Sequence, residues 1–143
     1  MGNSVFSFFS PINDFSETNY KTLNNEILIE ALSSLGITGE ASGRNDLTVD
    51  GKKVSGSAYK LNLGRKDGSH RKSLHHGTML LNANLSAMSG YLNPAKPKLE
   101  SKGVESVISR VMNLSEKKPD INNEMWWNAL EQAFENYHYP RHI

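Results

Sequence analysis

Two adjacent lysines, Lys52 and Lys53, follow the dipeptide Asp50-Gly51 in a chain that has no cysteine. Asp-Gly between two short runs with alternating apolar residues is a strong signal for a two-residue hairpin turn. Side chains on such a hairpin alternate between the two faces of the ribbon. Counting outward from the turn, we expect four opposite pairs: Val49 with Lys52, Thr48 with Lys53, Leu47 with Val54, and Asp46 with Ser55. One face is then polar and carries Asp46, Thr48, Lys53 and Ser55.

This predicted register makes the two lysines different. Lys53 shares the polar face with Asp46, and diagonal neighbours on a ribbon lie about 7–8 Å apart, within reach of a lysine side chain. Lys52 falls on the apolar face next to the turn and extends into solvent. Gly56 and Ala58 are small and leave room for something large to approach the backbone. A charged pair beside small residues indicates a catalytic or binding face; the alternative is an ordinary amphipathic hairpin with a solvated polar face.

The histidines give a weaker signal. His75 and His76 are adjacent, so on a strand they point to opposite faces and do not readily bind one metal ion. We expect one of them to line a pocket and the other to point elsewhere. His138 and His142 have the helical spacing of metal ligands, but Pro140 interrupts a helix between them. The absence of cysteine excludes disulfides, thiolate metal sites and a cysteine nucleophile within this chain.

Composition places these residues in one globular domain. The chain has 143 residues, of which 37% are hydrophobic and 22% charged, with a net charge of +1. A charge near neutrality gives no reason to expect a nucleic-acid or membrane partner. No apolar run is long enough to span a bilayer, and the N-terminus does not have the pattern of a secretory signal.

Strand and helix patterns alternate along the chain. Strands are predicted over Ser4–Phe9, which Pro11 would end, over the two arms of the hairpin, over Gly77–Leu85 and over Val104–Leu114. Helices are predicted from a cap near Ser16 to Gly36, over Leu85–Leu92, and from the cap Asn122 to Pro140, with Ile121 and Trp126 as a hydrophobic staple. The fold class expected is a mixed α/β (α+β) domain.

A family resemblance covers most of this chain. The stretches "GNSVFSF", "EASGRNDLTVDGKKVSGSAYK", "HHGTMLLNANLS", "YLNP" and "KLESKGVESVISRVMNLSE" follow one another from Gly2 to about Glu116. Together they resemble lipoate–protein ligase A. The resemblance implies part of a biotin/lipoate-ligase catalytic domain, with a mixed sheet and flanking helices.

The activity implied by the resemblance has two steps. Lipoate and ATP, with Mg²⁺, give lipoyl-AMP and pyrophosphate. The lipoyl group then passes to a lysine on a lipoyl-acceptor domain of a 2-oxoacid dehydrogenase complex or on the H protein of the glycine cleavage system. The implied compartment is the cytoplasm or the mitochondrial matrix.

The family's essential lysine immediately precedes Val-Ser-Gly, which makes it Lys53 here. An ammonium there is suited to holding the carboxylate against the α-phosphate. Asn45 and Asp46 offer oxygens for magnesium or a ribose. The other positions that match the family's substrate and adenylate pocket are Asn3, Ser55, Gly56, Ala58, His76, Gly77 and Thr78.

Some features depart from the family pattern. A glycine-rich loop is expected just before Gly2-Asn3, a small accessory domain is expected after the catalytic one, and Ile108 stands where an arginine is usual. We therefore expect the chain by itself not to make lipoyl-AMP. A transferase that uses preformed lipoyl-nucleotide and a non-catalytic remnant remain alternatives, whereas an octanoyltransferase would require a cysteine.

Overall fold

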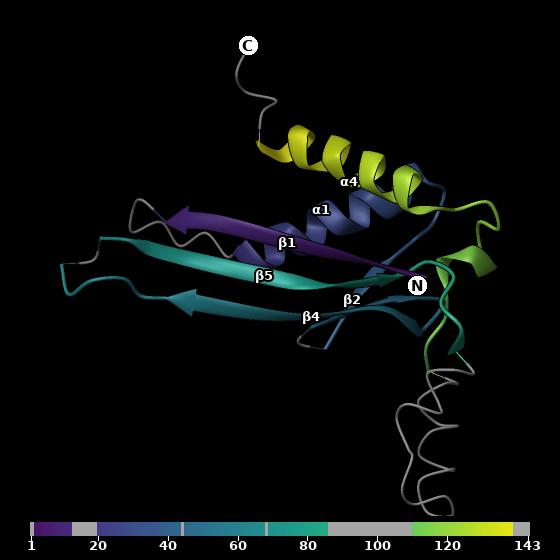
Figure 1. Ribbon diagram of the computed structural model, residues 1–143, viewed down its shortest axis with the longest axis horizontal. Coiled ribbons are helices and arrows are strands. Elements are labelled where there is room, and N and C mark those ends of the chain that lie inside the picture. Colours follow the sequence, from purple (N-terminus) through teal and green to yellow (C-terminus); the bar gives the residue numbers. More distant parts are fainter. Residues whose placement is uncertain (1, 13–19, 44, 68, 86–109, 139–143) are drawn as a thin grey trace, which may run out of the picture.

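Five strands and two long helices make up the part of the chain that this computed structural model describes, residues 2–12, 20–43, 45–67, 69–85 and 110–138 (Figure 1). The strands are β1 (Asn3–Ile12), β2 (Glu40–Ser42), β3 (Asp46–Val49), β4 (Lys52–Asn62) and β5 (Arg71–Leu80). The helices are α1 (Tyr20–Ser34), the short 3-10 helix η1 (Leu114–Glu116) and α4 (Asn123–His138).

The strands form one sheet in the order β1-β5-β4-β3-β2. Each of the four ladders is antiparallel. Among the described residues, the one parallel pairing is an isolated bridge between Lys53 and Val111. The mixed α/β fold is therefore confirmed, although the sheet is mixed only through that bridge.

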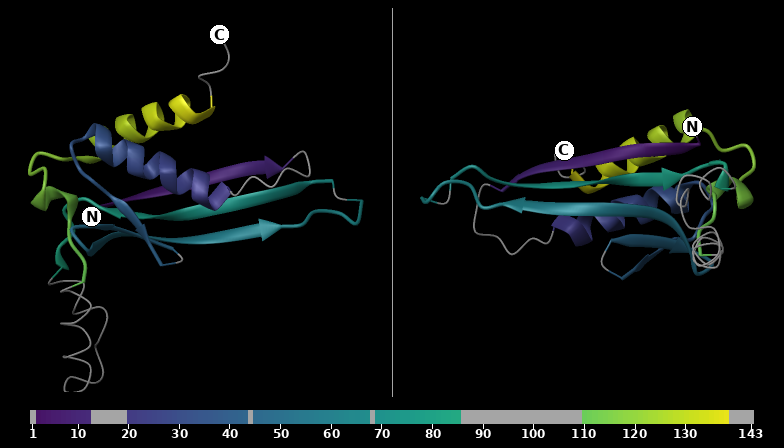
Figure 2. Two further views of the ribbon diagram at one scale, coloured as in Figure 1. Left: turned by 180° about the vertical axis from the view of Figure 1, so that it is seen from behind. Right: turned by 60° about the horizontal axis from the view of Figure 1, so that its bottom comes forward.

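Both long helices cover the same face of the sheet and pack against each other (Figures 1 and 2). The core lies between this helical layer and the sheet, with the indole of Trp126 fully buried in it. Alternation along β1 distinguishes the face toward the helices from the face toward solvent: Phe6 and Phe8 are buried, whereas Val5 is 71% exposed and Phe9 63% exposed. The second face of the sheet carries no helix among the described residues, so its side chains remain accessible.

Local sequence signals give the element ends correctly in several places. Gly36 follows α1 with φ of +81°, the left-handed conformation that ends helices. The Asn122 side-chain oxygen accepts a hydrogen bond from the Met125 amide at 2.8 Å, which is the predicted cap of α4. Ile121 and Trp126 are both buried, as a staple requires. Ser16, Pro140 and the predicted helix beyond Leu85 lie outside the described residues.

Three predicted strands have other bounds in the structure. β1 continues past Pro11 to Ile12, because a proline is tolerated at a sheet edge, where its missing amide hydrogen has no partner to lose. β5 begins at Arg71 rather than Gly77 and ends at Leu80 rather than Leu85. Of the strand predicted over Val104–Leu114, residues 104–109 lie outside the described residues, and the remainder forms only the bridge at Val111 before η1.

Candidate functional site

The β3–β4 hairpin turns at Asp50-Gly51, as predicted. Asp50 has φ of +52° and Gly51 has φ of +79°, the positive pair typical of a type I′ turn. Next to the turn, Val49 pairs with Lys52 and Thr48 pairs with Lys53, again as predicted.

A β-bulge then changes the register. Asp46 pairs with Gly56 rather than Ser55, and Leu47 pairs with Ser55 rather than Val54. Val54 and Ser55 are consecutive residues that are both buried, at 0% and 2% exposure. The prediction that Ser55 shares the polar face with Asp46 is therefore wrong, because the bulge adds one residue to β4 and reverses the alternation beyond it. Gly56 takes the place opposite Asp46.

Lys53 and Asp46 form an ion pair on the face of the sheet away from the helices. Lys53 Nζ lies 3.2 Å from Asp46 Oδ1, and the two side chains are 43% and 41% exposed. The lysine side chain crosses Gly56, where an added Cβ would lie 3.0 Å from Lys53 Cε. A half-exposed pair of this kind contributes little to stability, so its charges remain available to a ligand.

The backbone of Lys53 is held by a segment far away in the sequence. The Lys53 amide donates to the Arg110 carbonyl at 2.6 Å, and the Met112 amide donates to the Lys53 carbonyl at 2.9 Å. Residues 110–112 therefore lie beside the start of β4, where the ladder between β4 and β5 has not yet begun. No sequence pattern predicted this contact beyond the strand expected around Val111.

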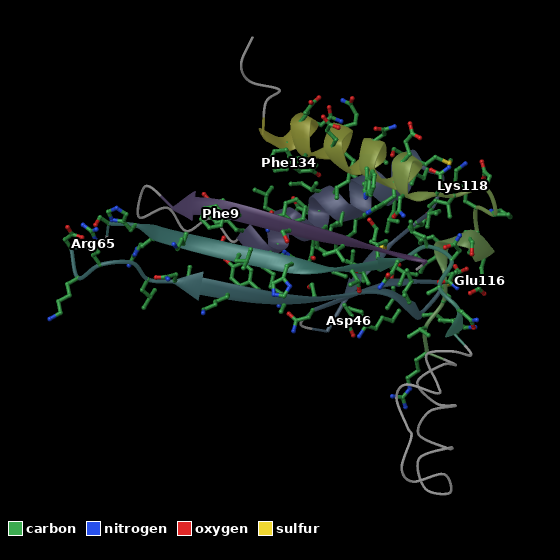
Figure 3. All side chains as sticks on the ribbon, in the orientation of Figure 1. Phe9, Asp46, Arg65, Glu116, Lys118 and Phe134 are labelled. Carbon is green, nitrogen blue, oxygen red and sulfur yellow. The ribbon has the colours of Figure 1, made fainter. Side chains whose placement is uncertain are left out.

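A hollow of about 470 Å³ surrounds the ion pair, and we call it the polar hollow. It lies on the accessible face of the sheet, where Figure 3 shows Asp46 directed away from α4. Its lining residues are Asn45, Asp46, Lys53, Gly56, Ser57, Ala58, His76 and Gly77. Seven of these eight are site residues proposed from the sequence, and Ser57 is the one that the sequence interpretation missed.

Three predicted site residues lie outside this lining, and one of them, Ser55, is buried beyond the bulge. Thr78 pairs with Gly56 across β4 and β5, so it shares the accessible face next to the polar hollow. Asn3 is exposed on β1 opposite Leu80, at the edge strand of the sheet and away from Asp46. The structure therefore brings together the hairpin and the His-Gly segment, whereas Asn3 is not adjacent to them.

The adjacent histidines point to opposite faces, as expected. His76 is exposed and lines the polar hollow, whereas His75 is completely buried in the core. Burial is the main cause that lowers the pKa of His75 to about 4, and electrostatic repulsion from Lys21 and His76 adds to it. His75 is therefore neutral at pH 7.

Gly77 is fixed by a close approach of backbone. A Cβ at this position would lie 2.4 Å from the Gly56 carbonyl oxygen and 2.8 Å from Phe6 Cζ. A backbone oxygen cannot move away without breaking the ladder, so glycine is required here for packing.

A second hollow, of about 440 Å³, lies between β1 and α4. Its lining includes Phe8, Phe9 and Phe134, and Glu131 is its one ionisable group; Figure 3 labels Phe9 on β1 and Phe134 on α4. A single carboxylate among aromatic rings does not provide paired charges for chemistry, so the polar hollow is the candidate active site.

The polar hollow offers few ligands for a metal ion. In the described part of the chain, no three residues of the types His, Cys, Asp and Glu are grouped to hold a metal ion. The Asn45 carbonyl already accepts hydrogen bonds from the Ser57 amide and hydroxyl, both at 3.0 Å. Asp46 offers one carboxylate, which fits Mg²⁺ only where phosphates and water supply the remaining ligands.

No helix in the described part of the chain is long and apolar enough to cross a membrane.

The sheet with two helices on one face is similar to that of solved lipoate protein ligases. An archaeal bi-partite lipoate protein ligase from Thermoplasma acidophilum, studied with its E2 lipoyl domain, superposes with a TM-score of 0.80 at 24% identity, over 96% of this chain and 51% of that chain. LipL1 of P. falciparum in complex with lipoate gives a TM-score of 0.70 at 32% identity, over 95% of this chain and 34% of that one. A lipoate-protein ligase A bound with ATP gives 0.74 at 23% identity, over 95% and 52%.

The family model of the lipoyl protein ligase A/B catalytic domain matches residues 1–135, and the chain belongs to this family. The lipoate-protein ligase A of Psychrobacter cryohalolentis is 44% identical over 138 residues, which is 96% of this chain. The chain spans 38% of the length of that relative. The family resemblance seen in the sequence is confirmed.

Proposed function

We propose that this chain carries the lysine-bearing part of a lipoate–protein ligase active site. In the first step, a lipoate carboxylate oxygen attacks the α-phosphorus of ATP, the bond to the β-phosphate oxygen breaks, and lipoyl-AMP and pyrophosphate form. In the second step, the amine of an acceptor lysine attacks the lipoyl carbonyl carbon, AMP leaves, the amine loses a proton, and an amide remains.

The observation that carries this proposal is the half-exposed Lys53–Asp46 pair at the polar hollow. A lysine ammonium is a compact charge that interacts with carboxylate and phosphate oxygens together. It thereby holds the two reacting groups in contact and offsets the negative charge that builds on the phosphate. Hydrogen bonds on both sides of the Lys53 backbone fix where this charge is presented.

The neighbouring residues suit a large, flat ligand. Gly56 has no side chain and Ala58 has a small one, so the adenylate can approach the strand backbone between Lys53 and His76. Asp46 would hold Mg²⁺ together with the ATP phosphates, and a bound ion would neutralise part of the phosphate charge. Asn45 and Asp46 also offer hydrogen-bond acceptors to a ribose.

The substrates and partners that we propose are those named for the similar structures. Lipoate is bound in the P. falciparum relative, ATP in another, and the archaeal ligase was studied with its E2 lipoyl domain. We extend these to this chain as ATP, lipoate and an acceptor lipoyl domain of a 2-oxoacid dehydrogenase complex or the glycine cleavage H protein.

Calorimetry tests the proposal with a non-hydrolysable lipoyl-AMP analogue and three proteins: wild type, Lys53→Ala and Lys52→Ala. Binding by wild type and Lys52→Ala, with loss in Lys53→Ala, is the expected result. Wild-type protein that does not bind the analogue would contradict the proposal and support a non-catalytic remnant. Pyrophosphate release with ATP and lipoate indicates a ligase, whereas transfer only from preformed lipoyl-AMP indicates a transferase.

A further inference from the structure

A line of hydrogen bonds runs from the helical layer through the sheet to the polar hollow. Asn24 on α1 has its Nδ2 atom 3.3 Å from His75 Nδ1 on β5. His75 Nε2 lies 2.9 Å from the hydroxyl of Ser57 on β4. That hydroxyl donates to the Asn45 carbonyl at 3.0 Å, in the residue just before Asp46. The line therefore begins in the helical layer and ends at a backbone carbonyl that also accepts from the Ser57 amide.

The hydrogens on this line have a single consistent assignment. Ser57 has one hydroxyl hydrogen and donates it to Asn45, so its oxygen accepts from His75 Nε2–H. His75 Nδ1 then carries no hydrogen and accepts from the amide group of Asn24. Each donor meets an acceptor only when His75 is neutral with its hydrogen on Nε2.

The surroundings of His75 maintain that state. Asn24 is 1% exposed and His75 0%, and the rings of Phe6, Phe8 and Tyr59 lie 5.8 to 6.1 Å from the imidazole. The positive charges of Lys21 on α1 and His76 on β5 oppose protonation, and burial keeps the pKa near 4. A buried polar group in this setting is costly unless it is hydrogen-bonded, so the line is strongly held.

We propose that Asn24, His75 and Ser57 are positioning residues, which together orient Asn45 and so place the Asp46 carboxylate against the Lys53 ammonium. This inference rests on the proposed function for its catalytic meaning, but not for its geometry. None of the three residues is assigned a chemical step.

The hydrogen bonds between Ser57 and Asn45 connect the buried residues to Asp46. The Asn45 carbonyl accepts from both the amide and the hydroxyl of Ser57, each at 3.0 Å. Asp46 is the next residue, and its backbone pairs with Gly56, the residue before Ser57. Removing the Ser57 hydroxyl leaves the hydrogen bond from the Ser57 amide to the Asn45 carbonyl, and the strand pairing, in place. The expected result is a correctly folded protein in which the Asp46 side chain is less well oriented.

The first experiment compares Ser57→Ala with a matched control, Ser73→Ala. Ser73 is a buried serine, 1% exposed, whereas Ser57 is half-buried; the two project from the same face of the sheet, and the Ser73 hydroxyl has no partner among the described residues. We expect Ser57→Ala to weaken binding of the lipoyl-AMP analogue about fivefold, the effect of one lost hydrogen bond, and Ser73→Ala to leave it unchanged.

The second experiment replaces His75 with Gln and with Leu. Glutamine keeps an N–H donor for Ser57, whereas leucine keeps only the volume, so we expect Gln to restore most of the affinity that Leu loses. A role limited to core packing would give the reverse order. Nitrogen NMR of the wild-type imidazole checks the assignment directly and is expected to find the neutral Nε2–H form.

The NMR spectrum of the ligand-free protein separates this inference from the proposed function. Ser57→Ala is expected to shift the side-chain signals of Asp46 and Lys53, and Ser73→Ala is not. If wild-type protein does not bind the analogue, the proposed function fails, and the NMR shifts alone decide the positioning role. Equal spectra and affinities for the two serine variants, or an Nδ1–H tautomer, would overturn it.

Discussion

Lys53 Nζ lies 3.2 Å from Asp46 Oδ1, yet the two residues are not paired in the ladder of β3 and β4. Lys53 pairs with Thr48, and Asp46 pairs with Gly56. The bulge at Val54 brings a residue without a side chain opposite Asp46, and the lysine extends across it. The ion pair at the centre of the proposed site therefore depends on one extra residue in β4.

The two lysines are predicted to differ sharply in function. In a longer protein that carries this region together with the family's glycine-rich loop, Lys53→Ala, and also Lys53→Arg, should reduce lipoyl-AMP formation about 100-fold, because neither keeps a compact positive charge at that point. Lys52→Ala should stay within about twofold of wild type, because the Lys52 side chain is exposed beside the turn. Pyrophosphate release measures the activity, and analogue affinity gives the same ranking in binding. Equal losses in the two alanine variants would contradict the register observed here.

Asp46→Asn is predicted to affect the two half-reactions unequally. Adenylation should fall, and the fall should be partly offset at high magnesium, because the amide removes the one carboxylate of the polar hollow. Transfer from preformed lipoyl-AMP should change less. The measurement is one assay per half-reaction across a magnesium titration. If both half-reactions fall by the same factor at every magnesium concentration, Asp46 serves both steps or only the structure.

Two glycines on adjacent strands, Gly56 on β4 and Gly77 on β5, are predicted to respond differently to an added methyl group. Gly77→Ala should lower the free energy of unfolding by about 2 kcal/mol or more, because its Cβ would lie 2.4 Å from a backbone oxygen. Gly56→Ala meets only the end of the Lys53 side chain, at 3.0 Å from Cε and 3.1 Å from Nζ, and that side chain is free to move.

Gly56→Ala should therefore fold normally and lose analogue affinity as the ammonium is displaced. Urea unfolding measures the stability of both variants, and calorimetry measures the affinity. A Gly56→Ala protein with wild-type affinity would show that the position of Lys53 over Gly56 does not matter for binding.

The buried histidine predicts a specific dependence of stability on pH. The pKa of His75 is about 4 in the folded chain against 6.5 in a solvated histidine, so between these values the unfolded chain binds more protons. The contribution of His75 to the free energy of unfolding is present in full above pH 6.5. It is lost as the pH falls toward 4, and this loss is on the order of 3 kcal/mol. Below pH 4 both states are protonated and this loss stops growing.

Urea unfolding at several pH values between 4 and 7.5 should therefore show stability rising with pH in wild type, with a smaller slope in His75→Gln. The matched control is His76→Gln, which removes the exposed neighbour and should keep most of the slope. An unchanged slope in His75→Gln would mean that other groups cause the pH dependence.

The sequence by itself determined the local features of this protein. Asp50-Gly51 defines the turn because only left-handed residues close a two-residue hairpin, and the Asn122 side chain caps α4 because it reaches an amide three residues away. Opposite directions for His75 and His76 follow from the two-residue period of a strand. Lys53 was distinguished from Lys52 by the same counting, which remains valid for the pairs next to the turn.

The pairing and burial of residues beyond the bulge depend on tertiary packing. Counting by two fails once a residue is added, and the bulge at Val54 occurs where the core accommodates both Val54 and Ser55, a matter of packing against distant elements. Because of the bulge, the Ser55 side chain is buried in the core. Ser57, missed in the sequence, lines the polar hollow, with His75 and Asn24 behind it. The contacts of Lys53 with residues 110–112 join segments more than 50 positions apart in the sequence. Such pairings depend on the folded chain as a whole, because no local pattern of residues specifies them.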